Sequence, residues 1–189
     1  MEDGYNTALD ETVAYYDRNA SAFVDGTFHA DVSGLYELFE GLLPAGARVL
    51  DLGCGSGILS IAAMLLGAES AVAVDVEENA VKIAVENAEK NHIDTAKYTA
   101  YCGNIIKDDE LTGRIGEGYD IITANIVADI LIGMKDHFYK FLKPDGILII
   151  SGIIDERKEE VTDAVTGAGF EIIKACEESD WAAVMLRKK

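Results

Sequence analysis

The stretch that decides the fold of this 189-residue chain is Val49-Leu50-Asp51-Leu52-Gly53-Cys54-Gly55-Ser56-Gly57. Its first four residues form an apolar run that carries one acid, and a short apolar run that ends in glycine is typical of a buried strand. A helical pattern begins directly after the third glycine. A strand that passes through glycines into a helix forms a pocket at the carboxyl end of the strand. Because glycine has no side chain, a ligand can lie directly against the main chain there.

The spacing of the glycines narrows the class of ligand. A dinucleotide site has the pattern G-x-G-x-x-G. In the two possible frames its third glycine would fall on Ile58 or on Ser60, so neither frame fits and the pattern argues against NAD or FAD. No lysine followed by serine or threonine comes after the glycines, which argues against a phosphate-binding P-loop. The pattern that remains is D-x-G-x-G-x-G. A strand–helix turn in some other kind of α/β domain is the alternative interpretation.

Apolar runs alternate with helical patterns along the rest of the chain. We expect strands at 49–52, 71–75, 97–102, 119–124, 147–151, 170–174 and 181–186. We expect helices at 9–23, 35–42, 58–65, 81–88, 127–141 and 161–168. Strands separated by helices predict parallel crossovers, whereas the last two strands have no helix between them and should pair antiparallel. The predicted fold class is α/β, with a doubly wound, mostly parallel, Rossmann-like seven-stranded sheet that ends in an antiparallel hairpin.

The D-x-G-x-G-x-G stretch resembles motif I of the class I S-adenosylmethionine (SAM) methyltransferases. Within that class, residues 46–189 are similar to the PrmA-type ribosomal protein methyltransferases. The similarity lies in Asn125-Ile126-Val127-Ala128, in Ser60-Ile61-Ala62-Ala63, in the apolar run 148–154 and in Trp181 before the last strand. The resemblance implies the class I fold, SAM as cofactor with S-adenosylhomocysteine as product, and N-methylation of an amino group of a ribosomal protein.

Polar residues at the ends of strands complete the predicted site. Asp75 ends the second strand, where an acid about 20 residues beyond the glycines binds ribose hydroxyls in doubly wound folds. The resemblance assigns Asp51 to the α-amino group of SAM, Asn104 with the N–H of Ile105 to adenine, and Asn125 to the acceptor. A helix cap is the alternative for Asp75 and Asn125, and a loop turn is the alternative for Asn104. The predicted cofactor-binding residues are Asp51, Gly53, Cys54, Gly55, Gly57, Asp75, Val76, Asn104, Ile105, Asn125 and Tyr16, and Asn125 is also the predicted catalytic residue.

Residues 1–45 are predicted to form a helical lead-in or lid before a SAM-binding domain at 46–189. The segment 15–23 is similar to the lead-in of small-molecule class I methyltransferases, in which a tyrosine, here Tyr16, closes over the cofactor. PrmA-type enzymes carry a separate N-terminal recognition domain, which we expect this chain to lack. A small-molecule N- or O-methyltransferase and a SAM-binding module without activity of its own therefore remain alternatives.

Composition limits the partners and the location. The net charge of −18 disfavours nucleic acid and favours a basic protein, such as a ribosomal protein, or a small-molecule amine, although solubility explains the charge equally well. No apolar run is long enough for a membrane span, and the amino terminus does not resemble a signal peptide. The three cysteines lack metal-ligand spacing, so we expect reduced thiols, no metal and a cytoplasmic location. No feature of the sequence sets an oligomeric state.

Overall fold

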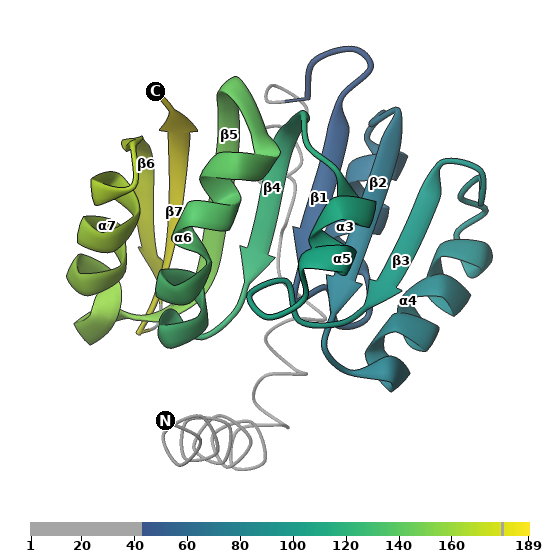
Figure 1. The fold of residues 1–189 in the computed structure, drawn as a ribbon, viewed down its shortest axis with the longest axis horizontal. Coiled ribbons are helices and arrows are strands. Elements are labelled where there is room, and N and C mark those ends of the chain that lie inside the picture. Colours follow the sequence, from purple (N-terminus) through teal and green to yellow (C-terminus); the bar gives the residue numbers. More distant parts are fainter. Residues whose placement is uncertain (1–42, 179) are drawn as a thin grey trace. The chain divides into compact units, whose positions relative to one another are not determined.

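The computed structural model describes residues 43–178 and 180–189, all of which belong to one compact unit (Figure 1). The strands are β1 (Arg48–Leu52), β2 (Ser70–Asp75), β3 (Tyr98–Cys102), β4 (Tyr119–Asn125), β5 (Leu142–Ile154), β6 (Phe170–Glu178) and β7 (Trp181–Lys188). The helices are α3 (Ile58–Leu65), α4 (Glu78–Lys90), α5 (Asp109–Ile115), α6 (Ala128–Phe141), the 3₁₀ helix η1 (Asp155–Arg157) and α7 (Lys158–Gly167). Among these helices, none has the length and apolar character needed to cross a membrane.

The strands form one seven-stranded sheet in the order β3-β2-β1-β4-β5-β7-β6. The first five strands are parallel, and β7 runs antiparallel to both β5 and β6. The predicted fold class, with its antiparallel hairpin at the end of the chain, is confirmed. The chain moves outward in one direction from β1 and in the other from β4, so the switch point lies between these two strands. Ligands of open α/β sheets bind outside the carboxyl ends of the strands at such a point.

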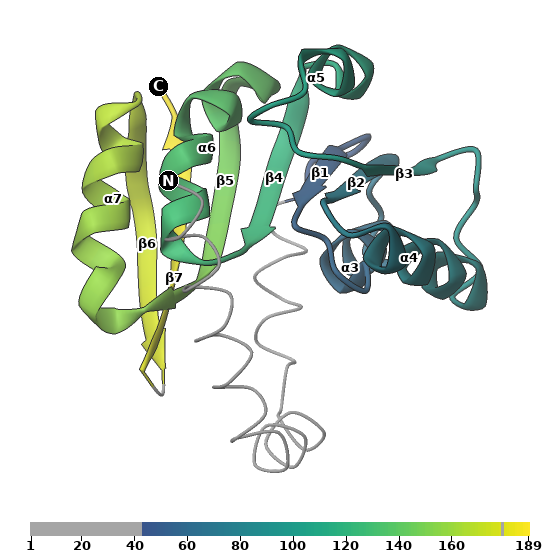
Figure 2. The same ribbon diagram turned by 60° about the horizontal axis from the view of Figure 1, so that its bottom comes forward.

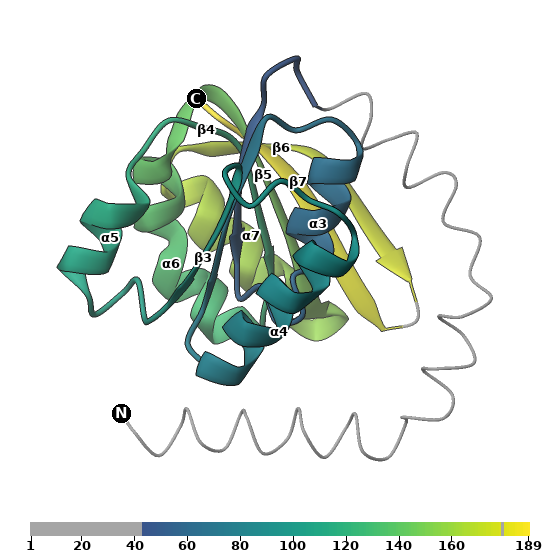
Figure 3. The ribbon, with the colours of Figure 1, turned by 90° about the vertical axis from the view of Figure 1, so that its right-hand side faces the viewer.

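Helices cover both faces of the sheet, as Figure 3 shows. On one face, α3 and α4 enclose a core of small and branched side chains that includes Val49, Ile61 and Ala84. On the other face, α5, α6 and α7 enclose a larger core. Its fully buried side chains include Leu131 and Phe138 of α6. The strands between the two cores are buried from both sides, which explains why they read as continuous apolar runs rather than alternating ones.

The start of β5 differs from the prediction. The strand was expected to begin at residue 147 but begins at Leu142, so Pro144-Asp145-Gly146 lies inside it, where the register between β4 and β5 shifts. Tyr119 pairs with Leu142, but Ile121 already pairs with Ile147, so the extra residues form a bulge. The bulge contains Asp145 at φ 61°, a conformation that a regular strand does not adopt.

Two further elements were not predicted at their full extent. α5 was missed because its seven residues include a glycine and too few apolar positions to show a helical period. It is stabilised instead by Asp108, whose carboxylate accepts a hydrogen bond from the N–H of Leu111 at 2.9 Å. β6 extends to Glu178 rather than to residue 174 because it pairs with β7 along its whole length. The helices predicted at 9–23 and 35–42 lie outside the described residues.

Phe138→Ala tests the larger core. Phe138 is fully buried in α6, and replacing such a phenylalanine by alanine costs about 3–5 kcal/mol through lost burial and the cavity left behind. We expect the free energy of unfolding, measured by urea denaturation, to fall by that amount. Ile58→Ala is the control because this side chain is 69% exposed, and it should change stability by less than about 0.5 kcal/mol. Equal losses in the two variants would contradict the assignment of this core.

Candidate active site

The turn after β1 depends on glycines in left-handed conformations. Gly53, Gly55 and Gly57 have φ angles of 68°, 51° and 80°. The N–H groups of Gly53 and of the next residue both donate to the carbonyl oxygen of Val74 in β2, at 2.8 and 3.0 Å. At Gly57 a Cβ atom would lie 2.8 Å from the hydroxyl oxygen of Tyr98, so only glycine allows α3 to start this close to the sheet. The turn is therefore anchored to β2 before the helix begins.

The middle glycine has the geometry of a ligand cradle. Apart from Gly55 and its two neighbours in the chain, no described residue has an atom within 4 Å of the position that a Cβ of Gly55 would take. Its N–H donates to Oδ2 of Asp75 at 2.8 Å, which holds the open stretch of backbone beside a carboxylate. This arrangement fits the predicted cofactor, because a ligand can approach the main chain here and reach the acid that follows β2.

Asp51 is buried behind the turn. Its side chain is 1% exposed, Oδ2 accepts from the N–H of Ser60 at 3.1 Å, and Oδ1 accepts from the hydroxyl of Thr123 at 2.8 Å. Burial raises the pKa of Asp51, and the hydrogen bonds from Thr123 and Ser60 offset only part of that rise. The carboxylate thus joins β1 to the first turn of α3 and to β4. Its predicted contact with an α-amino group stays a prediction, while the structure shows it bracing the turn.

Three residues that support the site were not predicted to belong to it. They are Ser60, Thr123 and Tyr98, which together with Asp51 form a buried polar network. The hydroxyl of Ser60 donates to the carbonyl of Gly57 at 3.0 Å and lies 3.1 Å from the hydroxyl of Tyr98. Burial raises the pKa of Tyr98 to about 12, so this hydroxyl stays protonated. The sequence offers one indication of this network: Thr123 is a polar residue within the apolar run of its strand.

Asp75 lies at the mouth of the turn, half-buried at the end of β2. Oδ2 accepts from Gly55, and Oδ1 accepts from the N–H of Glu77 at 3.0 Å. The latter bond forms a local turn before α4 rather than a helix cap, because α4 begins at Glu78 and its first turn shows no side-chain cap. Each carboxylate oxygen retains a further lone pair, which is what two ribose hydroxyls require. Val76, also predicted to contact the cofactor, is 49% exposed beside it.

Asn104 follows β3 and forms a turn of its own. Its Oδ1 accepts from the N–H of Ile106 at 3.0 Å, which is the loop turn that the sequence left open as the alternative. The side chain of Ile105 is buried in the larger core and anchors this loop. The N–H of Gly103 donates to the carbonyl of Asp75 at 2.9 Å, which ties the loop to the end of β2. The contact of Asn104 and Ile105 with adenine stays a prediction.

Asn125 ends β4 with an exposed side chain. It pairs in register with Ser151 of β5, and the N–H of Ile126 donates to the carbonyl of Ser151 at 3.1 Å. The alternative of a helix cap is not found, because α6 starts at Ala128 after Val127 and shows no side-chain cap. Among the described residues, the carboxamide of Asn125 accepts and donates no hydrogen bond. It is therefore available to an acceptor.

The three cysteines differ in exposure. Cys54 is buried in the glycine turn, and burial, with the charges of Asp51 and Asp75, raises its pKa to about 12, so the group is a neutral thiol. Cys102 and Cys176 are free thiols on the surface. Within residues 43–178 and 180–189, no cluster of histidine, cysteine and acidic side chains is placed to hold a metal ion.

The structure brings most of the predicted residues to one edge of the sheet. The arrowheads of β1, β2 and β4 point to this edge in Figure 1, and Figure 2 turns it forward. The glycine turn touches Asp75 through Gly55 and touches Ile126 through Gly53, so the loops after β1, β2 and β4 are in direct contact. Tyr16 and residues 1–42 of the predicted lid lie outside the described residues.

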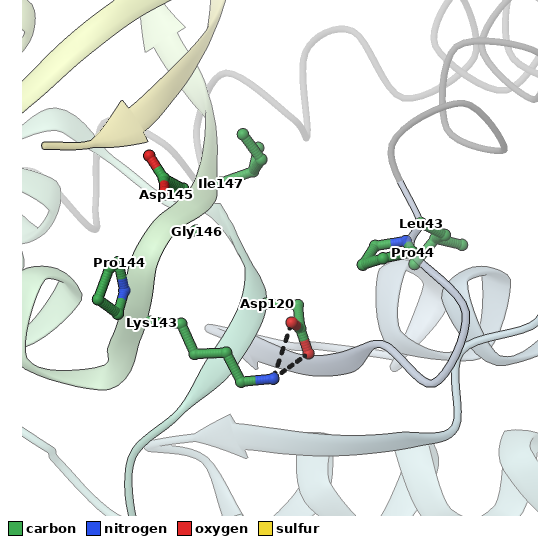
Figure 4. Close-up of a pocket in the computed structure, with 8 residues that line it drawn as sticks. All are labelled: Leu43, Pro44, Asp120, Lys143, Pro144, Asp145, Gly146 and Ile147. Atoms are coloured by element: carbon green, nitrogen blue, oxygen red, sulfur yellow. Dashed lines mark hydrogen bonds and ion pairs between the residues drawn. The ribbon is translucent and has the colours of Figure 1, made fainter.

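A cavity of about 390 Å³ lies at the opposite edge of the sheet (Figure 4). It is lined by Leu43, Pro44, Asp120, Lys143, Pro144, Asp145, Gly146 and Ile147. Asp120, near the start of β4, pairs with Nζ of Lys143 at 2.8 Å and accepts from the N–H of Arg48 at 2.8 Å. Burial opposes ionisation of Asp120, but these partners outweigh it and lower its pKa. None of the predicted site residues lines this cavity.

Comparison with known proteins agrees with this geometry. A family model described as ribosomal protein L11 methyltransferase (PrmA) matches residues 20–189. A ribosomal protein L11 methyltransferase of Acetivibrio thermocellus is 40% identical over 166 residues, which cover 88% of this chain and 50% of that relative. A crystal structure of ribosomal protein L11 methylase from Lactobacillus delbrueckii subsp. bulgaricus aligns with a TM-score of 0.72 at 30% identity, covering 82% of this chain and 78% of the other. A TehB-like SAM-dependent methyltransferase from Corynebacterium glutamicum shares the fold, with a TM-score of 0.66 at 18% identity. The alignment covers 97% of this chain and 100% of the other.

The matches also show how much of the relatives this chain covers and where along the chain the similarity begins. The chain spans about half the length of the curated relatives that it matches first. The family match begins at residue 20, upstream of the boundary predicted at residue 46. Part of the segment 15–23, which is similar to the lead-in of small-molecule methyltransferases, is thus included in the match.

Asp51→Asn tests the burial of this carboxyl group behind the turn through the pH dependence of stability. Because burial raises the pKa of Asp51, the folded state binds more protons than the unfolded state between the ordinary aspartate pKa and the raised value. The stability that this group contributes is present at low pH and is lost as the pH rises through that window. Asparagine can accept from Ser60 and donate to Thr123 without a charge. We expect urea denaturation at a series of pH values to show the variant gaining stability over the wild type as the pH rises.

Asp120→Asn is the matched control, in which the change of stability with pH should have the opposite sign. The pKa of Asp120 is lowered, so its contribution to stability is present at higher pH and is lost as the pH falls. This variant should lose stability relative to the wild type as the pH rises. A pH dependence of the same sign in both variants would contradict the raised pKa of Asp51 and hence its burial behind the turn.

Proposed function

The chain belongs to the ribosomal protein L11 methyltransferase (PrmA) family, and from this premise we propose that it is a SAM-dependent enzyme that N-methylates an amino group of a ribosomal protein. The observation that carries the proposal is the cradle at Gly55, open above the backbone and held beside the Asp75 carboxylate. SAM, when bound, supplies a methyl group that its sulfonium has already activated. The protein must therefore mainly bind, align and exclude water.

The part of the site that would bind SAM, the methyl donor, consists of the loops after β1, β2 and β3, and is called the donor end. Asp75 would hold the ribose diol with the lone pairs that Gly55 and Glu77 leave unused. The loop at Asn104 and Ile105 would face the adenine. Net negative charge at this site suits a cationic ligand, and the half-buried position of Asp75 strengthens its hydrogen bonds relative to those in water.

The acceptor end is Asn125. Its exposed carboxamide offers an oxygen that can accept from the N–H of an amine and so orient the nitrogen lone pair toward the donor. A lysine amine titrates near ~10.4 in water, so it must lose a proton before it can act as a nucleophile. Desolvation in the site lowers the pKa of an amine and favours the neutral form.

The substrate class is proposed from the names of the relatives and from charge. The relatives in the match are named for methylation of ribosomal protein L11, and the net charge of −18 favours association with a basic protein over nucleic acid. A cytoplasmic location follows from such a substrate. Residues 1–45 are proposed as a lead-in to the SAM-binding domain at 46–189, with Tyr16 closing over the cofactor.

Labelled SAM identifies the acceptor. The full chain is incubated with methyl-labelled SAM and either purified ribosomal protein L11 or a set of small amines, and we expect label in the protein. Asn125→Ala should lower turnover by about 10- to 100-fold while SAM still binds, because the acceptor loses its orientation. Asn91→Ala, at the far end of α4, is the control and should retain turnover. Label in a small amine would indicate a small-molecule methyltransferase, and binding without any label would indicate a SAM-binding module.

Asp75→Ala tests the donor end separately. Hydrogen bonds to a charged group contribute about 1.5–3 kcal/mol, so SAM affinity measured by calorimetry should fall by about 10- to 100-fold. Asp94→Ala is a matched control because Asp94 forms the same kind of turn, with the N–H of Ala96 at 2.9 Å, away from the site. Unchanged SAM affinity in Asp75→Ala would exclude the ribose role.

A further inference from the structure

Gly152, directly beyond the register pair of Asn125 and Ser151, lies against Asn125. It has a φ of 77°, and a Cβ atom on it would lie 2.7 Å from Oδ1 of Asn125. The same Cβ would lie 3.1 Å from the nitrogen and 3.2 Å from the oxygen of Ile126. Real Cβ atoms essentially never approach other heavy atoms within 3.0 Å, so a side chain at residue 152 would displace the carboxamide.

Gly53 makes a similarly close contact with the same loop from the side of β1. A Cβ atom on it would lie 2.6 Å from Cγ1 and 2.7 Å from Cδ1 of Ile126. The side chain of Ile126 therefore packs directly on the first glycine of the donor turn. Gly53 follows β1 and Gly152 belongs to β5, and these are the two strands that pair with β4.

The loop that carries Asn125 is thus held between two glycines from neighbouring strands. No hydrogen bond from a described residue holds the Asn125 carboxamide, so the space left by Gly152 determines where that group can lie. The packing of Ile126 on Gly53 sets the distance between this loop and the donor turn. Orientation of this kind matters because a misplacement of about 1 Å can cost 100-fold in rate.

We propose that Gly152 is a positioning residue for methyl transfer, acting through Asn125, with Gly53 and Ile126 coupling the same loop to the cofactor turn. The inference rests on the proposed function, in which Asn125 orients the acceptor amine. A residue with this role affects turnover and leaves SAM affinity nearly unchanged, since it touches the acceptor loop and not the cradle at Gly55.

The test uses Gly152→Ala and Gly152→Asn in the full chain. Asparagine tolerates a positive φ better than alanine, so the second variant separates steric displacement from backbone strain. Gly167→Ala is the control, because no described residue beyond its chain neighbours and the nearby backbone of α7 has an atom within 4 Å of a Cβ there, and its φ is not positive. Turnover is measured with labelled SAM and ribosomal protein L11, SAM affinity by calorimetry, and the position of the carboxamide by the NMR signals of the Asn125 side-chain amide.

We expect both Gly152 variants to lose about 10- to 100-fold in turnover, to keep SAM affinity within about twofold, and to shift the Asn125 amide signals. The control should change none of these. In an Asn125→Ala background the carboxamide is gone, so Gly152→Ala should cost less than about twofold.

Three results would overturn the proposal: an unmoved Asn125 amide signal, an equal loss of turnover in both backgrounds, or failure of both Gly152 variants to fold. Failure of the wild type to bind SAM or to label L11 would instead reject the proposed function. The Asn125 amide signal would still report whether Gly152 places this side chain, so the two failures are distinguishable.

Discussion

The structure depends on the close approach of backbone at the end of β1. Gly53 packs against Ile126, and Gly57 packs against Tyr98 and Ala84, at distances that leave no room for a Cβ atom. Left-handed φ angles at these positions reinforce the requirement for glycine. Because the turn also hydrogen-bonds to β2, one short segment sets the relative positions of the loops after β1, β2 and β4.

Two aspartates flank this turn and serve different purposes because their surroundings differ. Asp51 is buried, and both of its oxygens accept hydrogen bonds from Ser60 and Thr123, so it stabilises the turn from behind. Asp75 is half-buried at the mouth, where its oxygens can accept further donors. A motif that contains an acid does not by itself say whether the acid meets a ligand, since burial and existing partners decide that.

The fold was largely predictable because apolar runs and helical periods report burial directly. The elements that differed are those in which tertiary contacts override local pattern. The bulge around Asp145 depends on pairing with β4, and the length of β6 depends on pairing with β7. The candidate site was predictable in outline, since residues at the carboxyl ends of parallel strands meet at one edge. The buried network of Ser60, Thr123 and Tyr98 was not, because its members are far apart in sequence and belong to no motif.

By itself the sequence determined the strand–helix alternation, the glycine turn and the polar residues that end β2 and β4, because these follow from local periodicity and from the conformations open to each residue type. Only the tertiary structure decided which acid is buried, which loops touch and what space Asn125 occupies. Those properties depend on contacts between strands that are distant along the chain, as with Gly53 and Gly152 on either side of Ile126. The motif supplies the glycines, and the contacts that neighbouring strands make with them set the geometry of the site.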